Sequence, residues 1–586
     1  MKLIELLAKR DRFAAAVRRQ LRHLMLLILI VVGAACGLAA VMLHKAMLAS
    51  YSLLVGAAES GPPGWGRVVA LVLMPTLMGA ILTTLVARYA PNANGGLGLV
   101  RTAYVRQPKR LAIRTWVGTF IATPLSLGSG APLGPEGPTV VITSGVSVAI
   151  ARLAALPERV VRGMIPVGTA AGIAAIFNTP ITGVVFALEE VIGTASRGVL
   201  GGAIVAAVAA AVVEKTLLGG HPLLPAAPAS WHRVSELFGF LVLGLAAGVT
   251  AGYMPRAVKA LRWRMRRLVR PAGRYREALL GGMAGLGAGA VGLFVPSVLG
   301  FGYEPISRWL AGEGDVSSAG WAFAAKLVVV TLALAAPLVG GVLAPTLFLG
   351  ASFGALVGHA LVLLFPNSPI DPGAYALVGM GAFFAGFLRT PLAAVLIVFE
   401  LTGDYALVLP QMLAVSTSLI VARRFSEHTL LEDQLEEEGV SAAEAGSDPL
   451  AQWRVRDAMT VPPVSVGAEV SVDAAWEIAV SSGHTCFPVA DEAGRVAGLV
   501  ERSQLLQARI EGRGAVPVSE IAIPAKVVAR PDESLDQLAL RLGVAEETRA
   551  PVIDSRAKKR LIGFITVSDL LRTRMRASIE SAVTFE

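Results

Sequence analysis

One glutamate in an apolar stretch stands where it could link a proton to an anion. Glu136 lies in the run GPEGP at 134–138. Glycine and proline end one helix and start the next, and the free N–H groups at a helix start favour an anion. Protonated Glu136 is neutral, whereas ionised Glu136 competes with an anion for the same place. The simpler alternative is a helix-start glutamate that is only stabilised by the dipole.

Two further runs have the composition of a helix start inside apolar sequence. They are GGVLAP at 340–345 and NGGLG at 94–98. Three helix starts that converge on one point would bind an anion without burying a full positive charge, which is costly in lipid. We therefore expect the three runs to meet in space.

The same segments reveal an internal repeat. Pro138-Thr139 matches Pro345-Thr346 at an offset of 207 residues, and Thr179-Pro180 matches Thr390-Pro391 at an offset of 211 residues. A glutamate follows nine residues after the second proline in both copies, at Glu189 and Glu400. Duplicated halves with interrupted helices place a substrate site near the bilayer midplane, between the halves.

The composition agrees with a membrane location for these elements. Of the 586 residues, 54% are hydrophobic and only 16% are charged, against roughly 25% charged in a soluble domain. This excludes a disordered chain and makes a single soluble domain unlikely at this length. The stretch 24–43 carries no charge and is long enough to span a bilayer. The 62 glycines and 34 prolines, many inside apolar stretches, indicate discontinuous helices of a transporter or channel.

The positive charge predicts the orientation. Basic residues crowd the segment 1–22, and Arg423 and Arg424 end the last apolar run, so both ends are expected in the cytoplasm. A further basic cluster at 256–276 is interpreted as a positive-inside loop rather than an RNA-binding patch. Two distant cysteines, Cys36 and Cys486, leave no scope for a disulfide scaffold or a four-ligand zinc site and are read as buried thiols, and no metal site is predicted.

The quoted motifs resemble those of the CLC family of chloride channels and proton-coupled anion antiporters. The matching segments are GPEGPTVVITSG, AAGIAAIFNTPITGVVFALEE, GGVLAPTLFLGA and FAGFLRTPLAAVLIVFELTGDY. The resemblance implies an α-helical polytopic membrane protein with an inverted repeat of two halves, and a homodimer with one anion pathway per subunit. It places Glu136 at the family's gating glutamate and Glu190 at the internal glutamate that relays protons in antiporters. A solvated acid at a helix end is the alternative for Glu190.

The anion-binding residues implied by the resemblance include several departures from the family. Leu97 replaces its coordinating serine, Leu431 replaces its coordinating tyrosine, Leu343 stands at a usual phenylalanine, and Pro135 replaces an arginine and has no N–H to donate. Backbone donors remain, so chloride is the default, with nitrate and fluoride left open. The expected anion-binding set is Gly96, Leu97, Gly98, Gly134, Glu136, Gly137, Val342, Leu343 and Leu431.

After the last apolar run the sequence resembles a cytoplasmic α/β pair of CBS domains. Such pairs often bind adenine nucleotides through a hydroxyl and a carboxylate on the ribose. Thr566 and Asp569 match that pattern, whereas Glu501 and Gln504 in the first copy do not. One nucleotide site is therefore expected, with a purely structural, dimerising module as the alternative. No cofactor is required for transport, and no Walker loop is present.

These observations predict a non-enzymatic, proton-coupled antiporter of small anions in a bacterial-type inner or plasma membrane. A passive voltage- or ligand-gated channel of the same fold, and a nucleotide sensor that no longer transports, remain as alternatives. The partners expected are chloride or another small anion, protons and a second copy of the chain, with no nucleic acid. The predicted segments are 1–22 (basic), 23–431 (membrane, halves 23–215 and 235–431), 432–452 (acidic linker), 453–512 and 513–578 (CBS domains) and 579–586 (tail).

Overall fold

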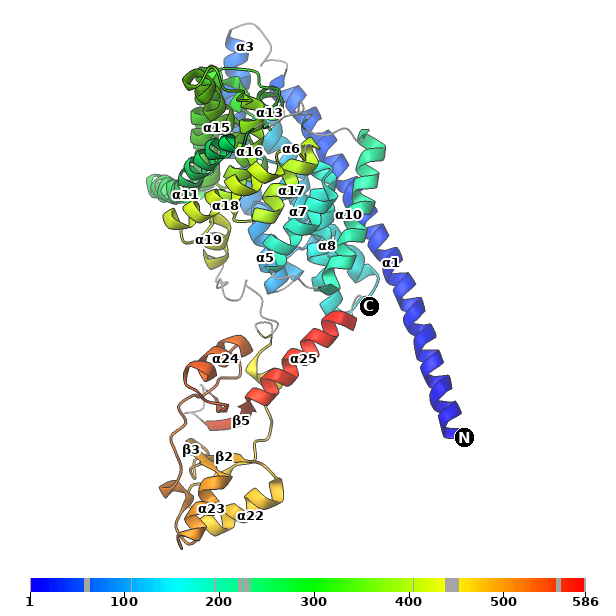
Figure 1. Cartoon of the computed structure of the whole chain (residues 1–586), viewed down its shortest axis with the longest axis vertical. Helices are drawn as coiled ribbons and strands as arrows, with labels where there is room; N and C mark the ends of the chain where they lie inside the picture. Colours follow the sequence, from blue (N-terminus) through cyan, green and yellow to red (C-terminus); the bar gives the residue numbers. More distant parts are fainter. Residues whose placement is uncertain are drawn as a thin grey trace. The chain divides into compact units, whose positions relative to one another are not determined.

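The chain folds into two compact units that divide near residue 445 (Figure 1). The computed structural model describes residues 2–56, 64–106, 108–193, 197–219, 224, 231, 233–403, 405–437, 450, 453–554 and 560–583. Most of the predicted acidic linker therefore lies outside the described residues. Among those described, eight helices are long and apolar enough to cross a membrane.

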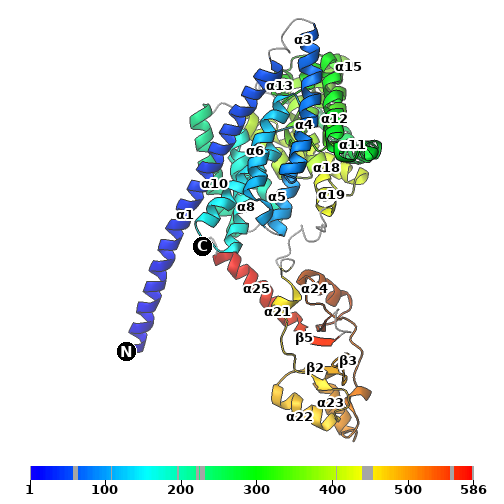
Figure 2. The same cartoon turned by 180° about the vertical axis from the view of Figure 1, so that it is seen from behind.

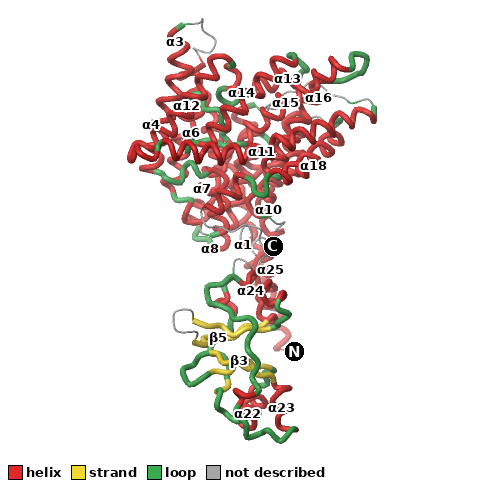
Figure 3. The backbone as a smooth tube through the Cα atoms, turned by 90° about the vertical axis from the view of Figure 1, so that its left-hand side faces the viewer, coloured by secondary structure: helices red, strands yellow, loops and turns green. Residues whose placement is uncertain are grey.

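Helices make up the first unit, whereas the strands all lie in the second, as Figure 3 shows by colour. The helices of the first half are α1 (Lys2–Tyr51), α3 (Trp65–Val68), α4 (Met74–Tyr89), α5 (Gly96–Val105), α6 (Ile113–Gly128), α7 (Glu136–Leu153), α8 (Glu158–Phe177), α9 (Pro180–Phe186) and α10 (Arg197–Leu218). A π-helical turn, η4 (Ala187–Ile192), extends α9.

The second half continues this helical unit. Its helices are α11 (Leu237–Leu268), α12 (Arg276–Phe294), α13 (Tyr303–Leu310), α14 (Val316–Ala335), α15 (Leu343–Leu364), α16 (Pro372–Leu388), α17 (Pro391–Thr402), α18 (Val408–Phe425) and α19 (Leu430–Glu437). The prediction of interrupted helices is confirmed, because many of these elements are too short to cross a bilayer alone.

Equivalent helices pack in the same way in the two halves. Helix α7 packs on α8 as α15 packs on α16, and α1 packs on α10 as α11 packs on α18. In both of the latter pairs glycines bring the helices close, since a Cβ on Gly37 would lie 2.8 Å from the Ala210 carbonyl oxygen and one on Gly248 2.6 Å from that of Ser418. Small residues allow such close approach of helices in membranes. Helices α4 and α12 join the halves and lie side by side in Figure 2.

The Thr-Pro repeat marks the same break in both halves. Helix α8 ends at Phe177 and α16 ends at Leu388, and the residues that follow, Asn178 and Arg389, lie in the left-handed region at φ values of 54° and 64°. The threonine follows, and the proline then starts α9 or α17. Proline is favoured at the first helical position because its missing N–H would be unpaired there anyway.

The basic cluster near the middle is largely helical, and the prediction of a loop there is wrong. Helix α11 continues from its apolar part through Arg256 to Leu268, and only the residues beyond form a short 3₁₀ turn at Arg270–Tyr275. Arginine and lysine are good helix formers, so a basic segment can extend an apolar helix past the membrane.

The second unit contains two α/β modules. The first holds β1 (Val466–Gly467), α22 (Val472–Ser482), β2 (Cys486–Ala490), β3 (Val496–Glu501) and α23 (Arg502–Ile510), with β1 parallel to β2 and β2 antiparallel to β3. The second holds α24 (Leu535–Val544), the antiparallel pair β4 (Arg549–Asp554) and β5 (Arg560–Thr566), and α25 (Val567–Val583).

The two modules exchange short segments. Helix α21 (Val455–Ala458) places Val455 in the core of the second module, together with Leu535 and Val552. Val518 packs in the core of the first module, beside Val466. Each core is therefore completed by a segment that lies next to the other module in the sequence.

Both cysteines are buried and free, and burial raises the pKa of the Cys486 thiol.

Candidate anion pathway and buried glutamates

Two helix starts from opposite halves meet at a pair of glycines. Gly134 and Gly341, which the repeat relates by 207 residues, bond to each other through both backbone groups, with N–H to carbonyl oxygen distances of 2.9 and 2.5 Å. Helix α7 begins at Glu136 and α15 begins at the equivalent residue, Leu343. The repeat thus brings the first turns of α7 and α15 face to face.

The carboxylate of Glu136 lies at the start of the opposite helix. The side chain is fully buried, and its Oε1 accepts a hydrogen bond of 2.6 Å from the Ala344 N–H. Its Oε2 has no hydrogen-bond partner among the described residues. The free N–H groups of a helix start are an anion site, so the carboxylate stands in the position that an anion would take.

Glycines make room for this carboxylate. A Cβ on Gly134 would lie 2.2 Å from both carboxylate oxygens of Glu136. A Cβ on Gly341 would lie 2.6 Å from the Gly137 nitrogen and 3.1 Å from the Glu136 carboxyl carbon. Any larger residue at these positions would therefore displace the carboxylate or separate the two helix starts.

A cavity of about 360 Å³ opens beside this point. Six of the predicted anion-binding residues line it, and the set is Gly96, Leu97, Gly98, Gly137, Val342 and Leu431. Gly134, Glu136 and Leu343 do not line the cavity but lie just beyond its end, next to Gly137 and Gly341. The three helix starts predicted to converge, those of α5, α7 and α15, therefore do so.

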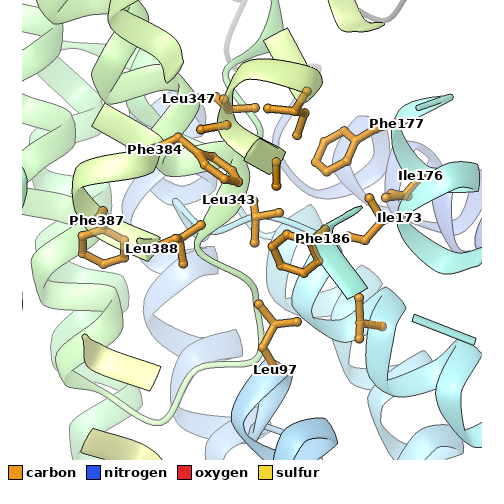
Figure 4. Close-up of a cluster of buried hydrophobic side chains, with 14 of the residues drawn as sticks. Leu97, Ile173, Ile176, Phe177, Phe186, Leu343, Leu347, Phe384, Phe387 and Leu388 are labelled. Carbon is orange, nitrogen blue, oxygen red and sulfur yellow. The ribbon is translucent and has the colours of Figure 1, made fainter. Parts of the chain in front are cut away.

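Apolar side chains surround the helix starts. Leu97 of α5, Phe186 of α9 and Leu343 of α15 gather in one cluster (Figure 4). Leu431 also belongs to the cluster, and a Cβ on Gly98 would lie 3.5 Å from its Cδ1. With leucine at these positions, backbone amides are the polar donors that the helix starts offer.

Glu190 has a charged partner that the sequence reasoning missed. The side chain is 5% exposed in η4, and its Oε1 lies 3.6 Å from Nη1 of Arg101. Arg101 is carried by α5, whose first turn lines the cavity. A buried acid in a membrane needs such a partner when it is ionised. One signal was available, namely an arginine in an otherwise apolar helix.

The neighbouring Glu189 plays a different part. Its two carboxylate oxygens accept hydrogen bonds from the N–H groups of Leu392 and Ala393, at 3.1 and 2.9 Å, at the start of α17. In return, Glu400 accepts from the N–H groups of Ile181 and Thr182, at 2.9 and 2.6 Å, at the start of α9. The repeated glutamates thus hold the two halves together by capping each other's helices.

The cavity lining also includes cationic side chains. Arg262 and Arg266 of α11 line it together with Gln434 of α19. The sequence interpretation assigned both arginines to a loop. Their spacing of four residues, which places two side chains on one helix face, was the signal that could have found them.

Side chains of metal-ligand type form a cluster on α19 and just before it. His428 Nδ1 is 3.9 Å from Asp433 Oδ1 and 3.6 Å from Glu436 Oε1. The same Asp433 oxygen is 2.5 Å from Nζ of Lys259 on α11. Because a lysine already neutralises the buried acid, we assign the cluster to the packing of α19 on α11.

The nucleotide-binding candidates belong to the second unit. Thr566 donates from its hydroxyl and its N–H to the same Asp569 oxygen, at 2.7 and 3.0 Å. The pair caps the start of α25. The structure therefore brings the two residues together, and their polar groups bond to each other.

The fold and the site define a membrane protein of two duplicated helical halves whose interrupted helices meet at a buried glutamate. The chain belongs to the voltage-gated chloride channel family, whose model matches residues 78–423, and CBS domains match residues 455–511 and 518–576. The membrane unit has the CLC fold, and the family's function is anion transport rather than catalysis.

Among its relatives is a ClcB-like protein of Ralstonia nicotianae, 33% identical over 301 residues that cover 51% of this chain and 69% of the relative. The H(+)/Cl(-) exchange transporter ClcA of Salmonella arizonae is 28% identical, covering 72% of this chain and 88% of the relative. The crystal structure of a eukaryotic CLC transporter matches 94% of this chain and 98% of its own with a TM-score of 0.65 at 20% identity. This last likeness concerns the fold.

Proposed function

We propose that the protein exchanges a small anion for protons across the membrane, with Glu136 as the gate. The observation that carries the proposal is the hydrogen bond from the Ala344 N–H to the Glu136 carboxylate. Ionised Glu136 occupies the start of α15 as an anion would. A protonated carboxyl group binds amides more weakly, leaves the helix start and frees it for an incoming anion. One site is thus held by an anion or by the ionised glutamate, and each exchange moves a proton.

Glu190 relays the proton on the cytoplasmic side in this proposal. Its side chain is buried, and the guanidinium group of Arg101, 3.6 Å away, stabilises its ionised form. Because Arg101 and the cavity-lining glycines share helix α5, the proton and anion routes meet at one element in this proposal.

Chloride is the default substrate, in keeping with the similar ClcA, an H(+)/Cl(-) exchange transporter. Nitrate and fluoride stay open because Leu97 and Leu431 supply no hydroxyl group. A strongly hydrated ion such as fluoride loses most when its water is replaced by apolar side chains. We further propose a homodimer in a bacterial-type plasma membrane, with both termini in the cytoplasm.

A passive channel of the same fold is the main alternative. Proton-driven anion uptake into liposomes separates the two, because a channel cannot move an anion uphill on a proton gradient. Uphill uptake supports exchange, and its absence in protein that carries passive anion flux contradicts it.

We also propose that the CBS pair binds one adenine nucleotide at Thr566 and Asp569. The hydroxyl and carboxylate are adjacent, as the ribose requires. Calorimetry of AMP, ADP and ATP binding to the full-length protein tests this. Losing charge-assisted hydrogen bonds in Asp569→Asn is expected to weaken binding roughly 10- to 100-fold.

The first-copy variant Glu501→Gln is the matched control and should bind as the wild type does. Equal loss in both variants, or no nucleotide binding by the wild type, would leave the module purely structural. Tight binding in a protein without any anion flux would instead favour a nucleotide sensor.

A further inference from the structure

Exposed arginines gather where α11 extends beyond its apolar part and on the short 3₁₀ turn that follows it. They are Arg256, Arg264, Arg267, Arg270 and Arg274. No acid among the described residues lies within ion-pair distance of these five, because Asp433 pairs with Lys259 instead and Glu277 with Arg276. None of the five lines the cavity. They form a separate, positively charged surface that attracts anions.

Two aromatic rings are exposed within this basic surface. Trp263 is 60% exposed and Tyr275 is 57% exposed. The guanidinium carbon of Arg267 lies 5.2 Å from the ring centroid of Trp263, and that of Arg274 lies 4.9 Å from the ring centroid of Tyr275. Tryptophan and tyrosine are enriched at the headgroup level of a membrane, and an arginine that stacks on a ring keeps its N–H groups free to donate.

The surface lies between two helices that are long and apolar enough to cross a membrane, α11 and α12. The apolar part of α11, residues 237–255, spans about 28 Å at about 1.5 Å per residue, which is close to the roughly 30 Å of a hydrocarbon core. The arginines that follow would be costly inside that core. They therefore lie at the level of the lipid headgroups, on the same side of the membrane unit as α19, whose Asp433 contacts Lys259.

An anionic phospholipid fits this surface better than a nucleic acid does. Leu268 at the end of α11 is 68% exposed, and Leu279 in the first turns of α12 is 44% exposed. A lipid covers arginines and leucines together at the membrane boundary, whereas a nucleic acid would leave the leucines uncovered. Basic clusters next to a spanning helix are typical of anionic-lipid recognition.

We propose that this surface binds the headgroup of an anionic phospholipid from the adjoining leaflet. We call it the basic turn and define it as Trp263, Arg264, Arg267, Arg270, Arg274 and Tyr275. Its guanidinium groups donate to the lipid phosphate, and its two rings lie against the glycerol region. The basic turn shares no residue with the proposed gate, the proposed relay or the cavity, so it stands whether or not the chain exchanges anions for protons.

Equilibrium binding of a fluorescent phosphatidylglycerol to the full-length protein in non-ionic detergent micelles tests the site. The double variant Arg267→Gln with Arg274→Gln removes two charges and both ring contacts. Its matched control is Arg502→Gln with Arg509→Gln in the second unit, because these exposed arginines also lie over a ring, that of Trp476, at 5.9 and 5.5 Å. Phosphatidylcholine with the same label measures the binding that does not depend on the net charge of the lipid.

The wild type and the control variant should bind phosphatidylglycerol about a hundredfold more tightly than phosphatidylcholine, because each arginine near the headgroup adds to the attraction. The variant of the basic turn should bind phosphatidylglycerol about thirtyfold more weakly than the wild type does. Higher ionic strength should weaken the wild-type binding, since salt screens the arginines. Equal affinity of the wild type for the two lipids, or equal losses in the two double variants, would overturn the proposal.

A change in the shape of the turn is separated from the loss of charge by Arg267→Lys with Arg274→Lys, which keeps both charges. This variant should bind phosphatidylglycerol within about fivefold of the wild type, and a loss as large as that of the glutamine variant would contradict recognition by charge. Competition identifies the occupant. Displacement of the lipid by an equal concentration of glycerol phosphate, or of a single-stranded oligouridylate, would assign the surface to a soluble phosphate or to nucleic acid and would overturn the lipid site.

Discussion

Glu136 and Glu190 are both buried acids, but their surroundings differ. The Glu136 carboxylate is held by a backbone amide among glycines, and no cation is within ion-pair distance among the described residues. The Glu190 carboxylate faces the guanidinium of Arg101. An acid held only by an amide can exchange places with an anion, whereas an acid beside a fixed cation stays in place. The two surroundings therefore suit the different roles, gate and relay, that we propose for these acids.

The role of Glu190 can be tested by Glu190→Gln, which keeps the shape but cannot carry a charge. We expect proton movement to fall to background while passive anion flux continues, because the gate and the cavity are untouched. Parallel pH and chloride readings on one liposome preparation measure both.

Glu158→Gln, an exposed acid in the first turn of α8, is the control and should leave both fluxes unchanged. Normal proton movement in the Glu190 variant would show that it is only a buried partner of Arg101.

The sequence predicts where helices end and begin, because glycine and proline break helices locally. It does not predict which distant residues come into contact. Glu136 could be predicted at a helix start because the glycines and prolines around it fix the break locally. That its carboxylate would reach Ala344 could not, since this contact joins residues 208 positions apart. Arg101 and Arg262 were missed for the same reason, because their significance depends on which helix lies opposite.

At the scale of elements, short helices from opposite halves cap one another. Glu189 closes the start of α17, and Glu400 closes the start of α9. Such reciprocal hydrogen bonds fix the two halves at the point where their helices are broken. The repeat in the sequence predicted the equivalence of the two glutamates, but not that each serves the other half.

Because Glu189 and Glu400 are equivalent in the repeat, replacing either one should cost a similar amount of stability. Glu189→Gln and Glu400→Gln should each lower the free energy of unfolding by roughly 1.5 to 3 kcal/mol, because each removes charge-assisted hydrogen bonds to a helix start. Thermal unfolding of the detergent-solubilised protein measures this.

The matched control is Glu277→Gln in the first turn of α12, whose side chain is 36% exposed. It should change stability by less than about 0.5 kcal/mol. A loss in only one of the two repeat-related variants would contradict the reciprocal arrangement.

At the scale of the whole molecule, the duplication explains how the helix starts are arranged around the cavity. The repeat pairs Gly134 with Gly341 between the halves, and this places two helix starts against each other beside one cavity. Composition and repeat were enough to predict a membrane unit of two halves. The helical extension of α11 was not predicted, because charge alone does not distinguish a loop from a helix, and only the four-residue spacing of Arg262 and Arg266 favours a helix there.

In the exchange that we propose, coupling is a property of the whole assembly, since the proposed gate lies on α7 and the proposed relay on η4. The most direct measurement places the protein in liposomes with equal chloride on both sides and the membrane potential clamped at zero, and applies a pH gradient as the only driving force. Protons leaving down their gradient should drive chloride inward against its rising internal concentration, and Glu136→Gln should abolish this uptake while passive chloride flux persists. A wild-type protein that shows passive chloride flux but no uphill uptake, or a variant that still couples, would contradict proton-coupled exchange gated by Glu136.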